Sequence, residues 1–293
     1  MKQLLLILNP VSGQKKAVKN LADIISVFNR ADYDVHVYVT AQSKDATNAV
    51  ERFAEQMDLI VCCGGDGTLN ETVSGMMHTG LRVPIGYIPS GSTNDFANSL
   101  GLSGNMVTAA KQIVKGKIKP YDIGMFGERY FSYVASFGAF TKASYATPQN
   151  IKNVLGHIAY LLEGIQEFSK IKKEHLRLET EQDVLEDDYL FGAICNSRSL
   201  GGILKLNSEL VDMGDGRFEI FLVRAPKNLQ ELHECVLALK NQKYDCGMLT
   251  FRSARRITVE ADPDMIWTLD GERAEGGERI YIENLHQSIL LKH

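Results

Sequence analysis

This 293-residue sequence lacks long apolar runs. None approaches the ~20 residues that a membrane-spanning helix needs. The apolar start of the chain turns directly into Asn-Pro and Ser-Gly, without the small-residue cleavage site of a signal peptide. The sequence also lacks an excess of basic residues, because its formal net charge is −4. We therefore expect neither a membrane-spanning segment nor a secreted chain, and charge gives no support for binding to nucleic acid.

Cysteine patterns typical of metal sites or disulfide frameworks are absent as well. The five cysteines are odd in number, scattered and without C-x-x-C spacing. Cys62 and Cys63 adjoin each other in an apolar run. Neighbouring residues of one strand point to opposite faces, which suits two buried, reduced thiols. Reduced thiols predict a cytoplasmic protein.

No linker rich in Pro, Gly or Ser, no internal repeat and no low-complexity tract divides the chain. The composition, with 44% hydrophobic and 23% charged residues, is that of a folded globular protein. A length of 293 residues exceeds the size at which one core usually suffices. We expect two closely packed domains: residues 1–124, to which the C-terminal residues 285–293 can belong, and residues 125–284.

The first domain shows an alternation of short apolar runs with helical patterns. The apolar runs predict strands at residues 4–8, 35–40, 58–63 and 84–89. The helical patterns lie at residues 15–30, 45–57, 68–78, 93–100 and 106–115. Strands that alternate with helices indicate crossover connections and a parallel sheet covered on both faces.

The second domain has a different pattern, in which strand-like runs follow one another between turns. These runs lie at residues 129–138, 175–180, 188–196, 217–223, 256–261, 266–271 and 279–284. Two helices, at residues 151–169 and 229–241, interrupt them. Consecutive short strands predict an antiparallel sandwich or barrel.

Three polar, flexible loops follow three strands of the first domain, at residues 9–13, 64–68 and 90–95. In an open α/β sheet, ligands bind beyond the carboxyl ends of the strands, where such loops meet helix N-termini that favour anions. Taken singly, the first loop could be an ordinary turn and the third a helix cap. Together on one edge of a sheet, the three loops favour a phosphate site.

The loop at residues 64–68 surrounds one carboxylate, Asp66, with glycines. The Walker pattern is absent, and so is the dinucleotide fingerprint, because Asn70 stands where its last glycine would be. A carboxylate in a phosphate loop would repel phosphate unless a cation such as Mg²⁺ lies between them. We therefore expect the glycines to let phosphate approach the backbone and Asp66 to hold Mg²⁺.

These motifs carry a resemblance to a known family. The sequence GGDGTLNE after a strand is similar to the signature of the diacylglycerol kinase catalytic domain. The sequences NPVSG, PSGSTNDFA and LDGE match, in order, the other motifs of the soluble bacterial lipid kinases, which are related to sphingosine kinases. GGDGT alone is less specific, since NAD kinases and 6-phosphofructokinases carry it too. The four motifs together span nearly the whole chain.

The resemblance implies ATP- and Mg²⁺-dependent phosphorylation of a lipid hydroxyl. It implies a Rossmann-like parallel α/β domain with nucleotide loops, followed by an antiparallel β-sandwich domain, with the reaction in the cleft between them. Asp66 would bind the catalytic Mg²⁺, and Asp95 and Asp122 would complete a polar network. Some relatives have a lysine directly after NPxSG, where this chain has Gln14 and then Lys15. The ATP contacts implied are Asn9, Pro10, Val11, Ser12, Gly13, Thr40, Gly65, Asp66, Gly67, Thr68, Leu69, Asn70, Glu71 and Ser92.

An Asp-Gly sequence also precedes the strand expected at residues 217–223. On the residues alone it is either a turn between strands or a cation site. It is not an EF-hand, because Gly214 stands at a ligand position. The resemblance implies a structural Mg²⁺ here, held by the Asp215 carboxylate and the backbone carbonyls of Asp212 and Arg217.

The motif LDGE offers two carboxylates, Asp270 and Glu272, at the end of another expected strand. On the residues alone it is either a second Asp-Gly turn or a catalytic pair. A lipid hydroxyl is a weak nucleophile, so phosphoryl transfer needs a group that accepts its proton. The resemblance places the proton acceptor in this pair. We favour Glu272, with Asp270 directed towards the metal and the hydroxyl.

We therefore expect a cytoplasmic, ATP-dependent lipid kinase that acts on diacylglycerol or a similar lipid alcohol such as phosphatidylglycerol. The expected partner is a lipid at a membrane surface, reached by transient peripheral contact, and nucleic acid is not expected. The oligomeric state is open, a homodimer included. Two other functions also stay open: an NAD kinase, which shares GGDGT and a β-rich second domain, and a nucleotide-binding regulatory protein without catalysis.

Overall fold

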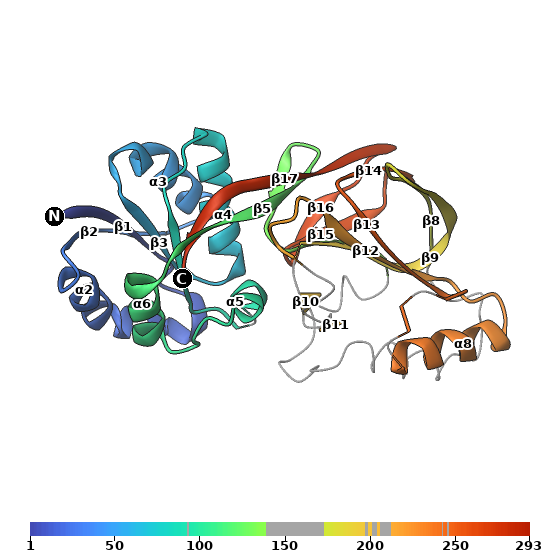
Figure 1. The fold of residues 1–293 in the computed structure, drawn as a ribbon, viewed down its shortest axis with the longest axis horizontal. Coiled ribbons are helices and arrows are strands. Elements are labelled where there is room, and N and C mark those ends of the chain that lie inside the picture. The colour runs from blue at the N-terminus through green and yellow to red at the C-terminus, as the bar shows by residue number, and fades with distance from the viewer. Residues whose placement is uncertain are drawn as a thin grey trace. The chain divides into compact units, whose positions relative to one another are not determined.

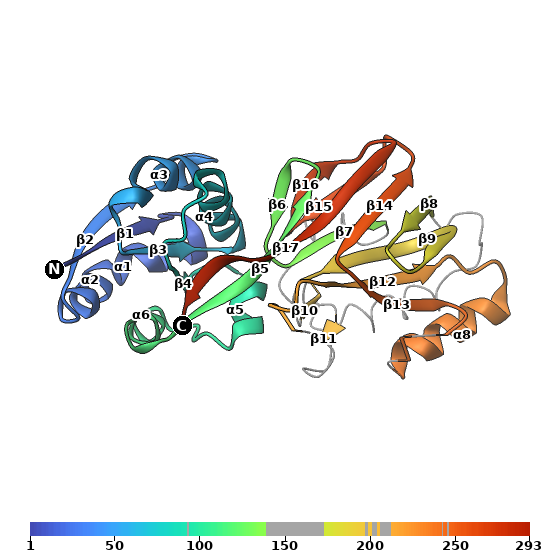
Figure 2. The same cartoon turned by 45° about the horizontal axis from the view of Figure 1, so that its top comes forward.

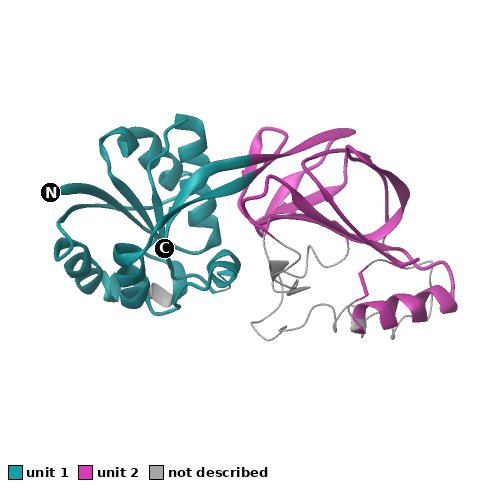
Figure 3. Ribbon diagram, in the orientation of Figure 1, with its two compact units in different colours: residues 1–123, 286–293 teal, residues 124–285 magenta. Residues whose placement is uncertain are grey.

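The computed structural model describes residues 1–92, 94–138, 173–196, 199–200, 204–205, 212–241, 243–244 and 246–293. The chain forms two compact units, residues 1–123 with 286–293 and residues 124–285 (Figure 3). Unit 1 is a parallel α/β structure and unit 2 an antiparallel β structure, so the fold class predicted from the sequence is confirmed. Within the described ranges, no helix has the length and apolar character needed to cross a bilayer.

Four parallel strands form the sheet of unit 1: β1 (Lys2–Leu8), β2 (Tyr33–Val39), β3 (Leu59–Gly64) and β4 (Ile85–Pro89). They pair in the order β2-β1-β3-β4, and the end of β17 (Arg279–Lys292) joins β4. Residues 4–8 of β1 and 59–63 of β3 are buried, as expected of central strands with helices on both faces. Burial raises the pKa of the Cys63 thiol to about 12, so this buried cysteine stays protonated, as the sequence predicted.

The helices of unit 1 are α1 (Lys16–Lys19), α2 (Leu21–Asn29), α3 (Asp45–Phe53), α4 (Asp66–Thr79), α5 (Asp95–Leu100) and α6 (Met106–Lys115). Helices α2 and α6 cover one face of the sheet, and α3 and α4 cover the other (Figure 1). The single helix expected at residues 15–30 is interrupted at Asn20, which precedes α2 as its N-cap residue. Asparagine competes for backbone hydrogen bonds and is therefore favoured at helix starts over helix interiors.

Unit 2 is built on antiparallel pairs (Figure 2). Its main path runs β16-β15-β7-β9-β8-β14-β17, and β12 pairs with both β9 and β13. Short strands β10 (Ser199–Leu200) and β11 (Leu204–Lys205) pair with each other, and α8 (Leu229–Lys240) is the helix expected at residues 229–241. The bounds of the other strands are β5 (Ile118–Phe126), which begins in unit 1, β6 (Arg129–Phe131), β7 (Val134–Gly138), β8 (Glu174–Glu179), β9 (Val184–Cys195), β12 (Phe218–Arg224), β13 (Leu249–Ala254), β14 (Arg256–Ala261), β15 (Ile266–Leu269) and β16 (Glu272–Glu275).

The sequence pattern did not predict β5, β13 and β16. Strand β5 contains Pro120 and Gly124, residues that usually weaken a strand assignment, and β16 has the largely charged sequence ERAE. Both form because they pair with a neighbouring strand, β5 with β17 and β6, and β16 with β15. The helix expected at residues 151–169 lies outside the described residues.

Aromatic packing organises the core of unit 2. The fully buried Trp267 ring meets Phe126 and Phe137 edge-on, at centroid distances of 5.0 and 4.9 Å. Phe131 and Phe218 stack at 5.5 Å in the same core. Such pairs contribute about 0.5–1.5 kcal/mol each beyond the area that they bury. The core therefore fixes the end of β15, from which the LDGE motif continues.

Candidate active site

The three polar loops of unit 1 meet at one edge of its sheet. Because β1, β3 and β4 run parallel in adjacent positions, their carboxyl ends lie together. Asn9 Nδ2 after β1 donates to Thr68 Oγ1 after β3 at 3.0 Å. The Ser90 N–H after β4 donates to the Gly64 carbonyl at 2.8 Å. The structure thus brings together the loops that the sequence singled out.

Ser12 connects the first loop to the third. Its hydroxyl donates to the Asn9 carbonyl at 2.9 Å and lies 2.6 Å from the Ser90 hydroxyl. Since the one proton of Ser12 goes to Asn9, the Ser90 hydroxyl is the donor of the second bond. Ser90, which was not among the predicted contact residues, therefore orients Ser12.

Glycines let the loops approach one another closely. Gly13 has a φ of +52°, and a Cβ placed there would lie 1.9 Å from the Ser90 carbonyl oxygen. A Cβ on Gly91 would lie 2.7 Å from the Cα of Gly65. The sequence predicted that the glycines serve the approach of phosphate. That prediction concerned the glycines around Asp66, whereas the structure shows that Gly13 and Gly91 are required for contact between the loops.

The GGDG loop leads directly into α4. Asp66 is the first residue of this helix, and the backbone of Gly65 precedes it without any side-chain cap. The first N–H groups of an α-helix have no partner within the helix. They are directed along the axis, where the helix dipole favours an anion. The start of α4 therefore suits a phosphate group.

Asp66 is a mostly buried carboxylate with one unused oxygen. Its Oδ2 accepts the Asp95 N–H at 3.2 Å, whereas its buried Oδ1 has no hydrogen-bond partner among the described residues. Burial raises the pKa of Asp66, and the N–H groups of residues 94–96 oppose this shift. A buried anionic oxygen without a partner is costly, and a cation would compensate it. The side chain therefore fits the role of holding Mg²⁺.

Asn94 shapes the third loop and was missed among the candidate residues. It adopts a left-handed conformation with a φ of 53°, its Oδ1 accepts the Gly91 N–H, and its Nδ2 donates to the Gly91 carbonyl, both at 2.8 Å. Asparagine is one of the few residues other than glycine that tolerates this conformation and bonds to its own loop. The sequence signal was present in the Ser-Thr-Asn-Asp run, which was interpreted as part of a phosphate loop or, alternatively, as a helix cap, without a separate role for Asn94.

Two of the predicted contact residues hold the scaffold. The Thr40 N–H donates to the Leu8 carbonyl at 2.9 Å, which extends the pairing of β2 with β1 beyond Val39. The Glu71 carboxylate accepts the N–H groups of Lys44 and Ala46 at 2.8 and 3.2 Å. Glu71 therefore caps the start of α3.

The remaining predicted contacts differ in exposure. Leu69 is fully buried, so only its backbone is available to a ligand, while the Val11 side chain is 74% exposed. Ser92 is also exposed, and Pro10, Gly67 and Asn70 are partly buried. Some relatives carry a lysine directly after NPxSG, where this chain has Gln14 and then Lys15. The side chains of residues 14–16 lie outside the described part of the structure.

The expected network of Asp66, Asp95 and Asp122 is only partly visible in the hydrogen bonds. Asp95 contacts Asp66 through its backbone N–H. The buried Asp122 carboxylate accepts the Gln287 N–H at 2.7 Å and lies 3.1 Å from His286 Nδ1. Gln287 adopts a φ of +48°. The last segment of the chain therefore positions Asp122 within unit 1.

The LDGE motif in unit 2 forms a tight hairpin between β15 and β16. Asp270 and Gly271 both have positive φ, 49° and 88°, as a two-residue type I′ turn requires. The Asp270 carboxylate accepts the backbone N–H groups of Ser132, Tyr133 and Val134 at 2.5, 3.0 and 3.0 Å. Asp270 thus fastens the hairpin to the start of β7, a structural role that the sequence did not predict.

Glu272 has the opposite environment. It is the first residue of β16, its side chain is exposed, and it forms no hydrogen bond or ion pair with any described residue. A carboxylate without a structural task is free to accept a proton from a substrate. Asp270 holds the hairpin in place, and the hairpin in turn fixes the backbone of Glu272.

The Asp-Gly sequence before β12 forms two side-chain-stabilised turns. Asp212 Oδ1 accepts the Gly214 N–H at 3.1 Å, and Asp215 Oδ1 accepts the Arg217 N–H at 2.9 Å. The Arg217 carbonyl accepts a hydrogen bond from Asn284 Nδ2 at 3.1 Å. No set of three Asp, Glu, His or Cys residues in the described ranges is arranged as a metal site. A cation here would need backbone carbonyls and water besides Asp215.

Glu219, two residues further on, was not predicted as part of this region. It is 3% exposed, and its Oε2 has no hydrogen-bond partner among the residues described. Burial, followed by the nearby charges of Asp215 and Asp212, raises the pKa of Glu219 to about 8. The carboxyl groups of Asp212, Asp215 and Glu219 gather at this turn beside Arg217, and a cation bound there would favour the ionised form of Glu219. The sequence signal is an acidic residue inside the otherwise apolar run FEIFLV.

The fold and these loops define an α/β protein with a loop-lined sheet edge that suits phosphate, joined to an antiparallel β unit. Comparisons with known proteins agree with this class. The family model "Diacylglycerol kinase catalytic domain" matches residues 3–126. The chain is 30% identical over 274 residues to the diacylglycerol kinase of Bacillus subtilis, covering 93% of this chain and 90% of that protein. It is 32% identical over 269 residues to the diacylglycerol kinase of Staphylococcus saprophyticus, covering 91% and 88%.

A solved structure shows the same relationship. The crystal structure of a diacylglycerol kinase from Bacillus anthracis superposes with a TM-score of 0.76 and 26% sequence identity, covering 99% of this chain and 96% of that one. The chain therefore belongs to the diacylglycerol kinase family. Membership of this family places it among the lipid kinases.

Proposed function

We propose that the protein is an ATP-dependent kinase that transfers the γ-phosphoryl group to the hydroxyl of diacylglycerol or a similar lipid alcohol. The observation that carries this proposal is the connected set of loops in unit 1, which contains a buried Asp66 oxygen without a hydrogen-bond partner among the described residues. Phosphoryl transfer depends mainly on positioning and on electrostatic stabilisation, and these loops offer both. The family relationship supplies the lipid class of acceptor.

The nucleotide phosphates would bind where the loops meet. The Thr68 hydroxyl, which accepts Asn9 Nδ2 and keeps its own proton, and the N–H groups at the start of α4 supply donors for phosphate oxygens. The contacts between the loops hold these donors in place before the nucleotide binds. Such preorganisation reduces the entropy lost on binding.

Asp66 is the residue proposed to hold Mg²⁺, through the Oδ1 that has no other partner among the described residues. Mg²⁺ held there would neutralise negative charge on the phosphate groups. Asp66 itself contributes a fixed negative charge, held in orientation by the Asp95 N–H. This arrangement explains why an acidic residue stands in a loop that otherwise favours anions.

Glu272 is the proposed proton acceptor. As the bond between the lipid oxygen and the γ-phosphorus forms, the bond from that phosphorus to the β,γ-bridging oxygen breaks and ADP leaves. The hydroxyl proton passes to the Glu272 carboxylate, which is exposed and unpaired among the described residues. Asp270 is assigned a positioning role, because backbone N–H groups of residues 132–134 occupy its oxygens.

A second cation, with a structural role, is proposed at the turn of residues 212–217. The Asp215 carboxylate and the backbone carbonyls of Asp212 and Arg217 would hold it. Its support is the group of carboxyls at that turn, where the buried Glu219 Oε2 has no hydrogen-bond partner among the described residues and burial raises the pKa of Glu219 to about 8. The ion would stabilise the start of β12.

The lipid substrate sets where the protein acts. Diacylglycerol resides in a bilayer, so the proposal includes transient, peripheral contact between a cytoplasmic protein and a membrane surface. The proposed contact involves the surface of the protein. No helix among the described residues could span a bilayer. The oligomeric state, a homodimer included, is a separate question that size measurements in solution answer.

One labelling experiment tests the proposed reaction. The protein is incubated with γ-labelled ATP and Mg²⁺, with diacylglycerol in mixed micelles, with phosphatidylglycerol in mixed micelles, or with NAD. Label that moves into the organic phase with diacylglycerol supports the proposal. Label in NADP identifies an NAD kinase instead, and ATP binding without any transfer identifies a regulatory protein.

A further inference from the structure

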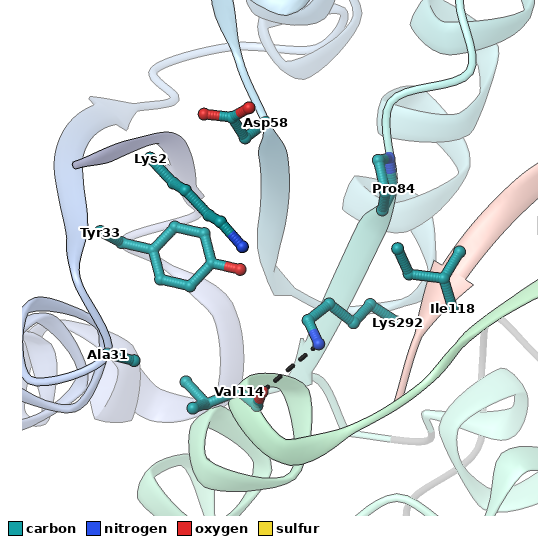
Figure 4. A pocket seen from close by; sticks show the side chains of 8 residues that line it. All are labelled: Lys2, Ala31, Tyr33, Asp58, Pro84, Val114, Ile118 and Lys292. Carbon is teal, nitrogen blue, oxygen red and sulfur yellow. Dashed lines mark hydrogen bonds between the residues drawn. The ribbon is translucent and has the colours of Figure 1, made fainter.

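A pocket lies in unit 1, at the edge of the sheet opposite the loops proposed to bind nucleotide (Figure 4). Its volume is about 340 Å³. Lys2 and Tyr33 are the first residues of β1 and β2, and Asp58 directly precedes β3. Lys292, the last residue of β17, closes the pocket. Lys2, Tyr33 and Asp58 mark the amino ends of β1, β2 and β3, and the end of β17 reaches the amino end of β4, whereas the nucleotide loops follow the carboxyl ends of β1, β3 and β4.

Two ammonium groups and a hydroxyl face this space. Figure 4 shows the tips of Lys2 and Tyr33 next to each other and the Lys292 nitrogen directed into the same pocket. The Lys2 ammonium lies 5.9 Å from the centre of the Tyr33 ring. The Tyr33 hydroxyl has no hydrogen-bond partner within the described part of the chain, although the tyrosine is only 7% exposed. A largely buried tyrosine usually finds a partner for its hydroxyl.

Lys292 is held in place without any carboxylate. Its ammonium donates to the carbonyls of Val114 and Gly116 at 3.3 and 2.6 Å, at the end of α6. Lysine has three protons to donate, so one is left for a ligand. Burial, and then the positive charge of Lys2, lowers the pKa of Lys292. An anion between the two lysines would relieve this repulsion.

The one acidic group in the pocket does not neutralise the lysines. Asp58 Oδ2 accepts the Gln3 N–H at 2.7 Å. In the described ranges, neither Lys2 nor Lys292 has a carboxylate within 4.0 Å. Two lysines and one aspartate leave the lining with a formal charge of +1. The pocket is therefore electrostatically suited to an anion.

We propose that this pocket binds a small organic phosphate. Its phosphate group would lie between the ammonium groups of Lys2 and Lys292 and accept the Tyr33 hydroxyl proton. Several donors that converge on one point suit the tetrahedral oxygens of phosphate. The apolar side chains of Val114 and Ile118 line the same pocket and would contact the organic part. Because this edge of the sheet is opposite the nucleotide loops, the ligand would not compete with the nucleotide.

The binding test uses inorganic phosphate and glycerol 3-phosphate as probes. Affinity is measured on the full chain at constant ionic strength, with chloride as the balancing anion, by following backbone amide resonances. Lys2→Met and Tyr33→Phe each remove one donor, and the phenylalanine keeps the ring packing against Phe28. Lys111→Met, an exposed lysine of α6 outside the pocket lining, is the matched control.

We expect saturable binding to the unmodified chain, with the largest shifts at residues 2–3, 33 and 58. Lys2→Met should weaken binding by about 10-fold or more, as expected for a lost charge-assisted hydrogen bond. Tyr33→Phe should weaken it measurably, and Lys111→Met should leave it unchanged. Equal affinity in all four proteins would overturn the proposal, and so would shifts confined to residues 64–69.

The headgroup of a phospholipid carries the same phosphate group as a small soluble ligand. A second experiment, vesicle sedimentation, distinguishes these two sources. The protein is sedimented with vesicles that contain phosphatidic acid, with and without the Lys2→Met substitution. We expect the protein to bind free phosphate. We also expect the Lys2→Met substitution to leave sedimentation with the vesicles unchanged. Lys2-dependent sedimentation without any response to free phosphate would overturn the assignment of a small soluble ligand. This outcome is independent of the proposed kinase reaction, because no readout involves transfer of phosphate.

Discussion

Replacing Asp66 by Asn separates the catalytic from the structural contribution of this carboxylate. The substitution keeps the shape of the side chain, and the Asn oxygen can still accept the Asp95 N–H that Oδ2 accepts now. It removes the negative charge from the buried position of Oδ1, which has no partner among the described residues. If Asp66 holds Mg²⁺, the variant loses an electrostatic group that acts on the transferred phosphate.

The expected effects on activity and stability have opposite signs. Loss of one well-placed electrostatic group should lower turnover by ~100-fold or more, which corresponds to about 2.7 kcal/mol. A buried polar atom without a partner costs ~1–3 kcal/mol, and the raised pKa of Asp66 shows that burial opposes its charge. Removing the charge should therefore leave the metal-free protein no less stable, with a melting temperature that rises by ~2–4 °C for each kcal/mol relieved.

The assay pairs lipid phosphorylation with thermal unfolding in EDTA. Asp34→Asn is the matched control, because Asp34 is an exposed carboxylate on β2 of the same unit, with 53% of its side chain accessible. The control should keep both activity and melting temperature. Near-normal turnover of Asp66→Asn at ordinary Mg²⁺ would refute the role in catalysis. A melting temperature several degrees lower would show that Asp66 stabilises the loops directly.

Three further substitutions test other parts of the structure. Gly13→Ala should weaken nucleotide binding and lower the melting temperature, because a Cβ at a φ of +52° would clash with the Ser90 carbonyl; unchanged nucleotide affinity by calorimetry would contradict the packing of the loops. Asp215→Ala should lower the melting temperature of the Mg²⁺-loaded protein without rescue by added Mg²⁺, and identical melting curves would leave only an Asp-Gly turn. Glu219→Gln should stabilise the metal-free protein, and the gain should increase as the pH rises from about 4.5 to about 8. In that range the folded state retains a proton on Glu219, whereas the unfolded state has lost it. A difference between the two melting temperatures in EDTA that does not change with pH would refute the raised pKa.

The sequence predicts those parts of the fold that depend on local patterns. The continuous apolar runs LLLIL and DLIVCC predict buried parallel strands, and both form. Helices α3 and α4 follow from apolar residues at helical spacing. Strand β5 was missed because its proline and glycine weaken the local signal, and only its partners β17 and β6 stabilise it.

The candidate site shows the same division between local and long-range information. The three loops could be located from glycines and hydroxyl residues after strands, together with their match to family motifs. The bond between Ser12 and Ser90 joins residues 78 positions apart, and no local pattern indicates it. The Asp270 carboxylate likewise accepts N–H groups 136 to 138 residues earlier in the chain. The sequence favoured Glu272 as the base through the family motif, but it gave no sign of the contacts that suggest a positioning role for Asp270.

The most direct test of the proposed reaction compares transfer of label from γ-labelled ATP to diacylglycerol by the unmodified chain, Glu272→Gln and Glu275→Gln. Glu275 is an exposed carboxylate on the same strand β16 and serves as the control. We predict that all three proteins bind ATP equally and that Glu275→Gln transfers label at the normal rate. Glu272→Gln should be slower by ~10²- to 10⁴-fold, as expected for loss of a general base. Transfer at the normal rate by Glu272→Gln, or no labelled lipid from the unmodified chain, would contradict the proposed reaction and its proton acceptor.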